Sequence, residues 1–299
     1  MIKGKNMRLH GIILAIAGPL LWGFSGIAAQ ALFTTYQMSP RWLVCIRMIG
    51  AGILLILFGY ATEPHAMNAP WRQPRSAGAL LVFSFIGMLP AQLTYFMAIK
   101  HSNAATATIL QFLSPVLIIV YLAIRYWHRP RKTDVVSVIL ALVGTYLLVT
   151  HGQLNQLSIS TTGFVWGLLT ALSTAIYTLF PRHLLRKFGA VPIVGWAMLL
   201  GGVSFLLFLR GKSLPVLDFR GILIVAFVII FGTLFAYLFV LQSLRFIAPT
   251  MTSLLGAFEP LTSTILTVLI FQIQFGWPEL IGTILIIMTT GLQALADSK

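Results

Sequence analysis

Long apolar runs separated by short polar connections dominate the hydrophobic pattern of this chain. A helix needs about 20 apolar residues to cross the hydrocarbon core of a bilayer. Ten runs of about that length follow one another, at 11–33, 40–60, 76–98, 104–124, 133–150, 162–180, 190–209, 219–241, 249–270 and 277–296. They do not alternate apolar and polar residues as barrel strands do, and backbone in lipid must satisfy its own hydrogen bonds. The pattern therefore predicts an all-α, polytopic membrane protein with ten transmembrane helices.

The composition agrees with this prediction. Of the 299 residues, 58% are hydrophobic and only 9% are charged, whereas soluble globular domains carry roughly 25% charged residues. The net charge is +14, but the 20 Lys and Arg fall between apolar runs instead of gathering on a folded polar face, as they do in nucleic-acid-binding proteins. A soluble enzyme, a disordered chain and a nucleic-acid partner are thereby excluded.

The basic residues also predict the orientation in the membrane. The first run has spanning length, so we expect it to be retained and not cleaved as a signal peptide. With the N-terminus inside, 14 Lys and Arg lie in inside segments and 5 in outside segments. Basic residues favour the cytoplasmic side, where they can rest on anionic headgroups. We expect a multi-pass protein of the inner (cytoplasmic) membrane with both termini in the cytoplasm.

The two halves of the chain resemble each other. Residues 98–117 read AIKHSNAATATILQFLSPVL and residues 243–262 read SLRFIAPTMTSLLGAFEPLT, so that Pro115 meets Pro260 at an offset of 145. Nearer the start of each half the offset is 152, and Pro40 meets Pro192. This predicts two five-helix repeats, 1–150 and 161–296. Because five is odd, the second repeat must enter the membrane inverted, which is a recurrent build of secondary transporters.

Polar residues recur at spacings of three and four in several runs, and such positions share one helix face. Stripes of this kind lie in the first, third, fourth, sixth, eighth and ninth runs, and they include Gln92 and Thr174. From these stripes we predict a central substrate cavity formed by Trp22, Ser25, Tyr95, Gln111, Tyr177, Tyr237 and Glu259. Aromatic rings would fill the apolar part of a solute, with Phe24 and Phe112 as further candidates, while Tyr, Gln and Ser would orient its polar groups.

Glu259 is the only acidic residue deep within a predicted span. An ionisable group at that depth costs at least ~2.5 kcal/mol and is by default a functional candidate. We expect it to bind a cation or a proton and to couple transport to proton movement. The alternative is a structural glutamate that fixes helix packing.

Two prolines occupy matching places in the fourth and ninth runs. Pro115 and Pro260 each remove a backbone donor and free the carbonyl four residues earlier, which predicts paired hinges in a cavity wall that bends. The alternative is that prolines are simply common in membrane helices.

Arg47 lies about seven residues into the second run. It could pair with Glu259 or with a substrate carboxylate. We favour a structural role, such as an extended side chain that reaches the outer interface.

Several of these features together resemble a known family. The sequence WGFSG at 22–26, Arg47, the proline of the fourth run, Gly144, Phe258-Glu259-Pro260 and Glu279-Leu280-Ile281-Gly282 are similar to EamA-type members of the drug/metabolite transporter superfamily. The resemblance covers essentially the whole chain. It implies a ten-helix, monomer-scale transporter of small solutes, often an exporter of amino acids or metabolites, with a cavity lined by helices 1, 3, 4, 6, 8 and 9.

Catalytic chemistry is not indicated. Gly23-Phe24-Ser25-Gly26 matches the G-x-S-G around an intramembrane protease serine, but such a serine needs a base within hydrogen-bond reach, and all six histidines fall in loops or at run ends. The single cysteine, Cys45, stands alone, so a metal site of ordinary ligand type is not expected. We predict no enzyme, no cofactor and no metal.

Three functions remain open on the sequence. The first is a secondary exporter of amino acids or related metabolites that works by alternating access, driven by the solute gradient or by protons. The second is a proton-coupled multidrug exporter of lipophilic cations, for which a buried glutamate among aromatic rings is expected. The third is a membrane scaffold or assembly factor that transports nothing, which predicts tight packing in place of a cavity.

Overall fold

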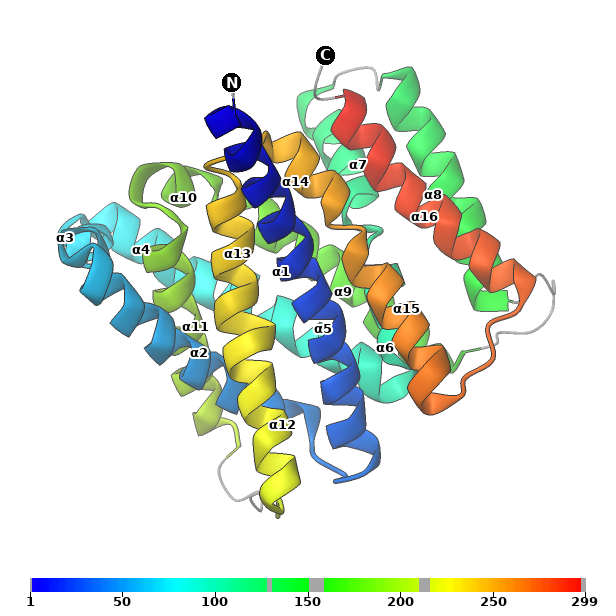
Figure 1. Ribbon diagram of the computed structural model, residues 1–299, viewed down its shortest axis with the longest axis horizontal. Helices are drawn as coiled ribbons and strands as arrows, with labels where there is room; N and C mark the ends of the chain where they lie inside the picture. Colours follow the sequence, from blue (N-terminus) through cyan, green and yellow to red (C-terminus); the bar gives the residue numbers. More distant parts are fainter. Residues whose placement is uncertain (1, 128–130, 151–158, 210–215, 297–299) are drawn as a thin grey trace.

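The computed structural model describes residues 2–127, 131–150, 159–209 and 216–296. Over these residues all regular structure is helical (Figure 1). The first half contains α1 (Ile2–Thr34), α2 (Pro40–Thr62), α3 (Pro64–Asn68), η1 (Ala69–Arg72), α4 (Pro74–Val82), η2 (Phe83–Met88), α5 (Leu89–His101), α6 (Ala104–Gln111), α7 (Ser114–Tyr126) and α8 (Lys132–Thr150). The second half contains α9 (Thr161–Leu179), α10 (Arg182–Phe188), α11 (Ala190–Leu207), α12 (Phe219–Ile229), η3 (Ile230–Phe235), α13 (Ala236–Ser243), α14 (Pro249–Leu255), α15 (Phe258–Phe271) and α16 (Trp277–Ala296).

Within these residues, eight helical stretches are long and apolar enough to cross a membrane, and they coincide with the first eight predicted runs. The fourth of them consists of α6 and α7. The ninth run is divided between α14 and α15, and the tenth forms α16; the apolar helices there, Phe258–Phe271 and Trp277–Leu292, are shorter than the other eight. The protein is thus an all-helical, multi-pass membrane protein.

Two helices contain one π-helical segment each. The segment η2 joins α4 to α5, and η3 joins α12 to α13. In η3 the widened turn is visible in the side-chain bonding, because the Thr233 hydroxyl donates to the carbonyl of Val228, five residues earlier, at 2.8 Å. Such segments are rare and are frequent at functional sites. The two segments match each other at an offset of 147 residues.

Two other helices are broken just before a proline. The α6 helix ends at Gln111, and Pro115 lies in the first turn of α7. The α14 helix ends at Leu255, and Pro260 lies in the first turn of α15. A proline lacks the N–H donor and its ring collides with the carbonyl four residues earlier, so an α-helix cannot run through unbroken without strain. Both helices therefore restart at the depth of the proline.

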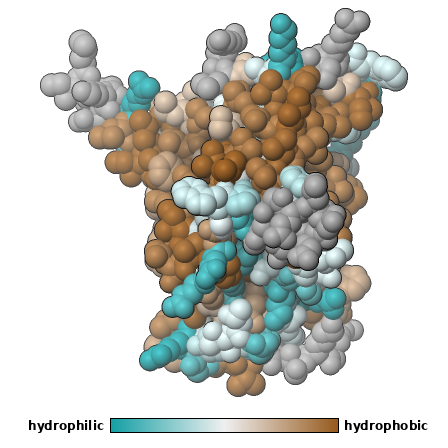
Figure 2. Space-filling model, turned by 90° about the vertical axis from the view of Figure 1, so that its right-hand side faces the viewer, coloured by the Kyte–Doolittle hydropathy of each residue, from teal (hydrophilic) through white to brown (hydrophobic). Residues whose placement is uncertain are grey.

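The helices pack in pairs that join the two halves. The α2 helix packs on α11, α5 on α9, α1 on α13 and α15, and α8 on α16. The α8–α16 pair lies at the right-hand side of the molecule in Figure 1. The start of α1 and the end of α16 both lie at the top of that view. Apolar side chains of α8 and α16, including Ile139, Leu142, Ile281 and Ile284, are exposed. Figure 2 shows hydrophobic residues over most of the upper part of this side of the molecule.

The crossing of α8 and α16 depends on two glycines. A Cβ atom added to Gly144 would lie 2.7 Å from the carbonyl oxygen of Gly282, and one added to Gly282 would lie 2.5 Å from the carbonyl oxygen of Gly144. The two backbones touch reciprocally at this point, which is how small residues allow close helix approach in membranes.

Candidate functional site

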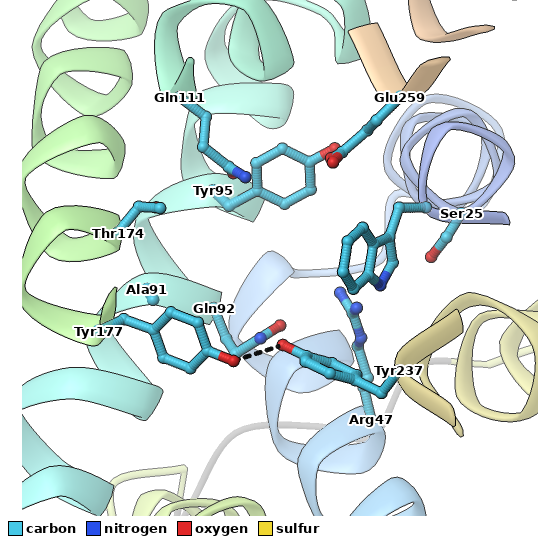
Figure 3. A pocket seen from close by; sticks show the side chains of 11 residues that line it. Ser25, Arg47, Ala91, Gln92, Tyr95, Gln111, Thr174, Tyr177, Tyr237 and Glu259 are labelled. Carbon is cyan, nitrogen blue, oxygen red and sulfur yellow. Dashed lines mark hydrogen bonds between the residues drawn. The ribbon is translucent and has the colours of Figure 1, made fainter. Parts of the chain in front are cut away.

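A cavity of about 220 Å³ lies where helices of the two halves meet. It is lined by Trp22, Ser25, Arg47, Ala91, Gln92, Tyr95, Gln111, Thr174, Tyr177, Tyr237 and Glu259 (Figure 3). These residues come from α1, α2, α5, α6, α9, α13 and α15. The cavity is therefore built by segments from both halves of the chain.

All of the residues predicted to form a cavity lie on this one cavity: Trp22, Ser25, Tyr95, Gln111, Tyr177, Tyr237 and Glu259. Their role in binding a substrate stays a prediction. Four lining residues were outside that set: Arg47, Ala91, Gln92 and Thr174. Gln92 and Thr174 belong to the same polar stripes, three residues before Tyr95 and Tyr177, whereas Ala91 carries no polar signal in the sequence.

Two further aromatic candidates lie elsewhere. Phe24 is 44% exposed and lines an apolar groove on the outside of the bundle with Phe231 and Phe235. Phe112 packs against a buried cluster around Leu110. Neither residue lines the central cavity. Helical spacing alone does not distinguish the side of a helix that faces lipid from the side that faces the cavity.

Arg47 is buried, with 5% of its surface exposed. Its Nε donates to the Thr233 hydroxyl at 2.7 Å and its Nη2 to the carbonyl of Gly232 at 3.2 Å, so it is bonded to the π-helical segment η3. Its guanidinium also lies 5.0 Å from the ring centroid of Phe96. The side chain does not extend to the outer interface. Arginine has five N–H donors, so donors remain beyond those two bonds.

Glu259 lies in the first turn of α15, directly after the break in the helix, and only 8% of its surface is exposed. In the part of the chain that the structure describes, no hydrogen bond or ion pair engages its carboxyl group, and Arg47 is bonded to η3 instead. A buried carboxylate without a partner is costly. The carboxyl group is therefore available to a ligand or a proton in the cavity.

The tyrosines divide the cavity into an accepting side and a donating side. The Tyr95 hydroxyl lies 3.0 Å from the Thr108 hydroxyl, which also lies 2.8 Å from the carbonyl of Ala104. When Thr108 donates to that carbonyl, Tyr95 can donate to Thr108 and keep its own oxygen as an acceptor. Tyr177 donates to Tyr237 at 3.3 Å, which leaves the Tyr237 proton for another acceptor. Figure 3 shows Tyr95 beside Glu259, and Tyr237 near Arg47.

Aromatic rings and a buried hydroxyl complete the walls. The Trp22 ring packs edge-on against Tyr237 at 5.3 Å, and Tyr177 stacks on Phe83 of η2 at 5.7 Å. The Ser25 hydroxyl is buried and has no hydrogen-bond partner among the described residues. A Cβ added to Gly232 would lie 2.3 Å from this hydroxyl oxygen, so α1 and η3 pack here too closely for a larger residue.

Fold and cavity together define a multi-pass membrane protein with a small polar hollow between its two halves. The chain belongs to the EamA-like transporter family, whose family model matches residues 9–150 and 161–293. It is 36% identical to the Salmonella typhimurium protein "Uncharacterized inner membrane transporter YicL" over 291 residues, covering 97% of this chain and 96% of that one. It is 26% identical to "Protein PecM" of Dickeya dadantii, covering 91% of this chain and 88% of that one. A solved crystal structure with 19% identity superposes with a TM-score of 0.67 over 96% of this chain and 97% of that chain, and supports the fold alone.

Proposed function

We propose that this protein is a secondary transporter that exports small zwitterionic metabolites, such as amino acids, across the inner membrane by alternating access. The observation that carries the proposal is the pair of opposite, mutually unpaired charges on one cavity. Glu259 and the Tyr95 oxygen would hold an ammonium group, while Arg47 and the Tyr237 hydroxyl would hold a carboxylate. Trp22 would cover the apolar part of the solute.

The size of the cavity supports a small solute. Pockets for drug-sized ligands measure roughly 300–1,000 Å³, and this cavity has a volume of about 220 Å³. A lipophilic cation would leave Arg47 facing it as an unfavourable like charge. The multidrug hypothesis therefore becomes an outcome of the experiment below, as does a scaffold that transports nothing.

We infer that the chain consists of ten helices in two inverted repeats, 1–150 and 161–296. The irregular features support this, because both η2 and η3 and both proline breaks recur at matching positions. The lining of the cavity supports it as well. At an offset of 152, Trp22 corresponds to Thr174 and Ser25 to Tyr177, and at an offset of 145 Gln92 corresponds to Tyr237; all six line the cavity.

We assign movement to the broken helices. Pro115 and Pro260 would act as hinges, since the helices that they interrupt meet the cavity at Gln111 and Glu259. Glu259 would take up a proton when the cavity faces one side and release it on the other, coupling export to the proton gradient. The protein would work as a monomer with both termini in the cytoplasm, and its relative in Salmonella typhimurium is named as an inner membrane protein.

The test is counterflow in liposomes that contain the purified protein. Labelled amino acids and labelled organic cations are offered separately, with and without a pH gradient. We expect uptake of an amino acid that depends on the gradient. Glu259→Gln should reduce this uptake at least tenfold and abolish the dependence on the gradient. Glu63→Gln, which alters an exposed glutamate at the end of α2, is the control and should leave uptake unchanged.

Three results would contradict the proposal. Uptake of cations without uptake of amino acids would support the multidrug hypothesis. Absence of flux for every solute class would support a scaffold. A normal pH-gradient dependence in Glu259→Gln would show that Glu259 is not the coupling residue.

A further inference from the structure

A second cavity, of about 510 Å³, lies away from the central one at the end of the molecule where α1 begins. Its walls are Met7 and Arg8 of α1, the connection between α13 and α14 (Arg245, Phe246, Ile247 and Ala248), and Met251 of α14. Figure 1 shows the start of α1 close to this connection. The central cavity shares no lining residue with it.

The chemistry of this second cavity is that of a site for an anion with an apolar tail. Its polar groups are two arginines, and every other lining residue is apolar. No acidic residue among those that the structure describes lines it. Neither guanidinium has a hydrogen bond or an ion pair with the described residues. Guanidinium groups bind phosphate oxygens with two parallel bonds, and the apolar walls suit the first carbons of acyl chains.

Contacts beneath the cavity close it toward the protein interior. A Cβ atom added to Gly11 would lie 2.6 Å from Cβ of Phe246 and 3.0 Å from Cγ2 of Ile247. The His10 ring packs edge-on against Phe246 at 5.2 Å. The cavity therefore ends against packed side chains, so a bound molecule would sit at the rim of the membrane, where phospholipid headgroups lie.

At the positions that correspond to Arg245 and Arg8 in the opposite halves, the polar side chains are bonded to the protein. At an offset of 145, Arg245 corresponds to Lys100, and at an offset of 152, Arg8 corresponds to Ser160. There the Lys100 ammonium donates to the carbonyl of Phe33 at 3.2 Å, and the Ser160 hydroxyl donates to the carbonyl of His101 at 2.8 Å. Protein atoms satisfy these polar groups, whereas Arg8 and Arg245 are left for another partner.

We propose that Arg8 and Arg245 form a binding site for the phosphate of an anionic phospholipid from the cytoplasmic leaflet, with its acyl chains entering along Met7, Phe246 and Met251. This assignment rests on the proposed orientation of the chain but not on its substrate. A soluble phosphate compound would gain nothing from the apolar walls, so the site is assigned to a lipid.

The test measures lipid binding and not transport. The full-length protein in detergent is titrated with phosphatidylglycerol or phosphatidylcholine, and bound lipid is counted by native mass spectrometry. We expect phosphatidylglycerol to bind at least fivefold more tightly than phosphatidylcholine. Arg8→Gln/Arg245→Gln should remove this preference, and Arg8→Lys/Arg245→Lys should retain part of it. The matched control Arg72→Gln/Arg75→Gln removes two exposed cations that do not line the cavity and should change nothing.

Two further measurements decide the source of the phosphate and guard against misfolded variants. Inorganic phosphate and glycerol phosphate should not compete with the lipid; equal competition would overturn the assignment to a lipid. Phosphatidylglycerol with a photoreactive group on its acyl chain should label Met7, Phe246 or Met251 in the unaltered protein. Unchanged lipid preference in Arg8→Gln/Arg245→Gln, or labelling confined to other residues, would overturn the proposal.

Discussion

The two halves of the molecule share their backbone irregularities but differ in the charges that they bring to the central cavity. Each half has a π-helical segment in its third apolar run and a proline break in its fourth. Arg47 comes from the first half, and its counterpart at an offset of 152 is Leu199; Glu259 comes from the second half, and its counterpart at an offset of 145 is Ser114. If the protein transports as proposed, the near symmetry would suit two similar states of the backbone, and the unequal charges would give a bound solute one orientation.

The largest effect is expected when the positive charge that only the first half contributes to the cavity is removed. Arg47→Gln deletes the positive charge of the cavity and both bonds to η3. The proposed bond between the guanidinium and a substrate carboxylate would contribute about 1.5–3 kcal/mol, so kcat/KM for amino acid transport should fall by up to about 100-fold, and Arg47→Lys should recover part of it.

Comparing two substrates separates a role of Arg47 in binding a carboxylate from a role in holding η3 in place. An amine without a carboxylate should lose much less transport than an amino acid in Arg47→Gln, because only the bonds to η3 are lost for it and no bond to a substrate carboxylate. Arg41→Gln, an exposed position on the same helix, is the control. Equal losses for the amine and the amino acid would mean that Arg47 only holds η3 in place.

A smaller effect is expected for the tyrosine pair that bridges the halves. Tyr177 of α9 donates to Tyr237 of α13 at 3.3 Å, and a neutral hydrogen bond contributes about 1 kcal/mol. Tyr237→Phe should raise KM for an amino acid about fivefold, since it also removes the free proton on the donating side. Tyr177→Phe should have a weaker effect. In a double-mutant cycle the two changes should be less than additive, and strict additivity would show that the bridge has no energetic role.

The smallest effect concerns the starts of α4 and α12, which begin the third apolar run of each half. Asp218 caps α12 by accepting from the Gly221 N–H at 2.7 Å, whereas Gln73 before α4 makes no side-chain cap. The Gly221 N–H, followed by the Tyr36 hydroxyl, lowers the pKa of Asp218 below its ordinary value. A lowered pKa means that the carboxylate stabilises the fold above its unfolded pKa, and that this contribution disappears as the pH falls through the folded pKa.

Asp218→Ala should therefore lower Tm slightly at pH 6, and its difference from the unaltered protein should shrink below about pH 4, where an unperturbed aspartate titrates. Thermal unfolding in detergent across this pH range measures both. Gln73→Ala removes hydrogen bonds from Lys187 and Ser76 but no helix cap, so any change that it makes in Tm should be the same at every pH in this range. A constant difference between Asp218→Ala and the unaltered protein down to pH 3 would show that the charge is irrelevant to the cap.

The sequence predicted the helices better than their interruptions. Eight runs appear as long apolar helices because apolar length alone decides whether a segment can span lipid. The proline breaks were visible as Pro115 and Pro260. The π-helical segments were not, because η3 is bonded to Arg47 from a residue 185 positions away along the chain, and no local pattern carries that contact.

The cavity shows the same limit. Polar residues at helical spacing identified the face of each helix, and these faces meet at one place. The direction of Arg47 could not be predicted, since a long cationic side chain near a helix end can reach water or turn inward with equal ease on the sequence alone. Its partners, a threonine hydroxyl and a backbone carbonyl, become available only after tertiary packing.

The π-helical segment η3 has a consequence for the direction of Tyr237, which follows it by two residues. A π-turn holds about one residue more than an α-turn. Were η3 to tighten into a regular α-helix, everything beyond it would turn by about 100° around the helix axis, and the Tyr237 ring would swing out of the cavity. Arg47 bonds the widened turn and would thereby help to keep the Tyr237 ring directed into the cavity.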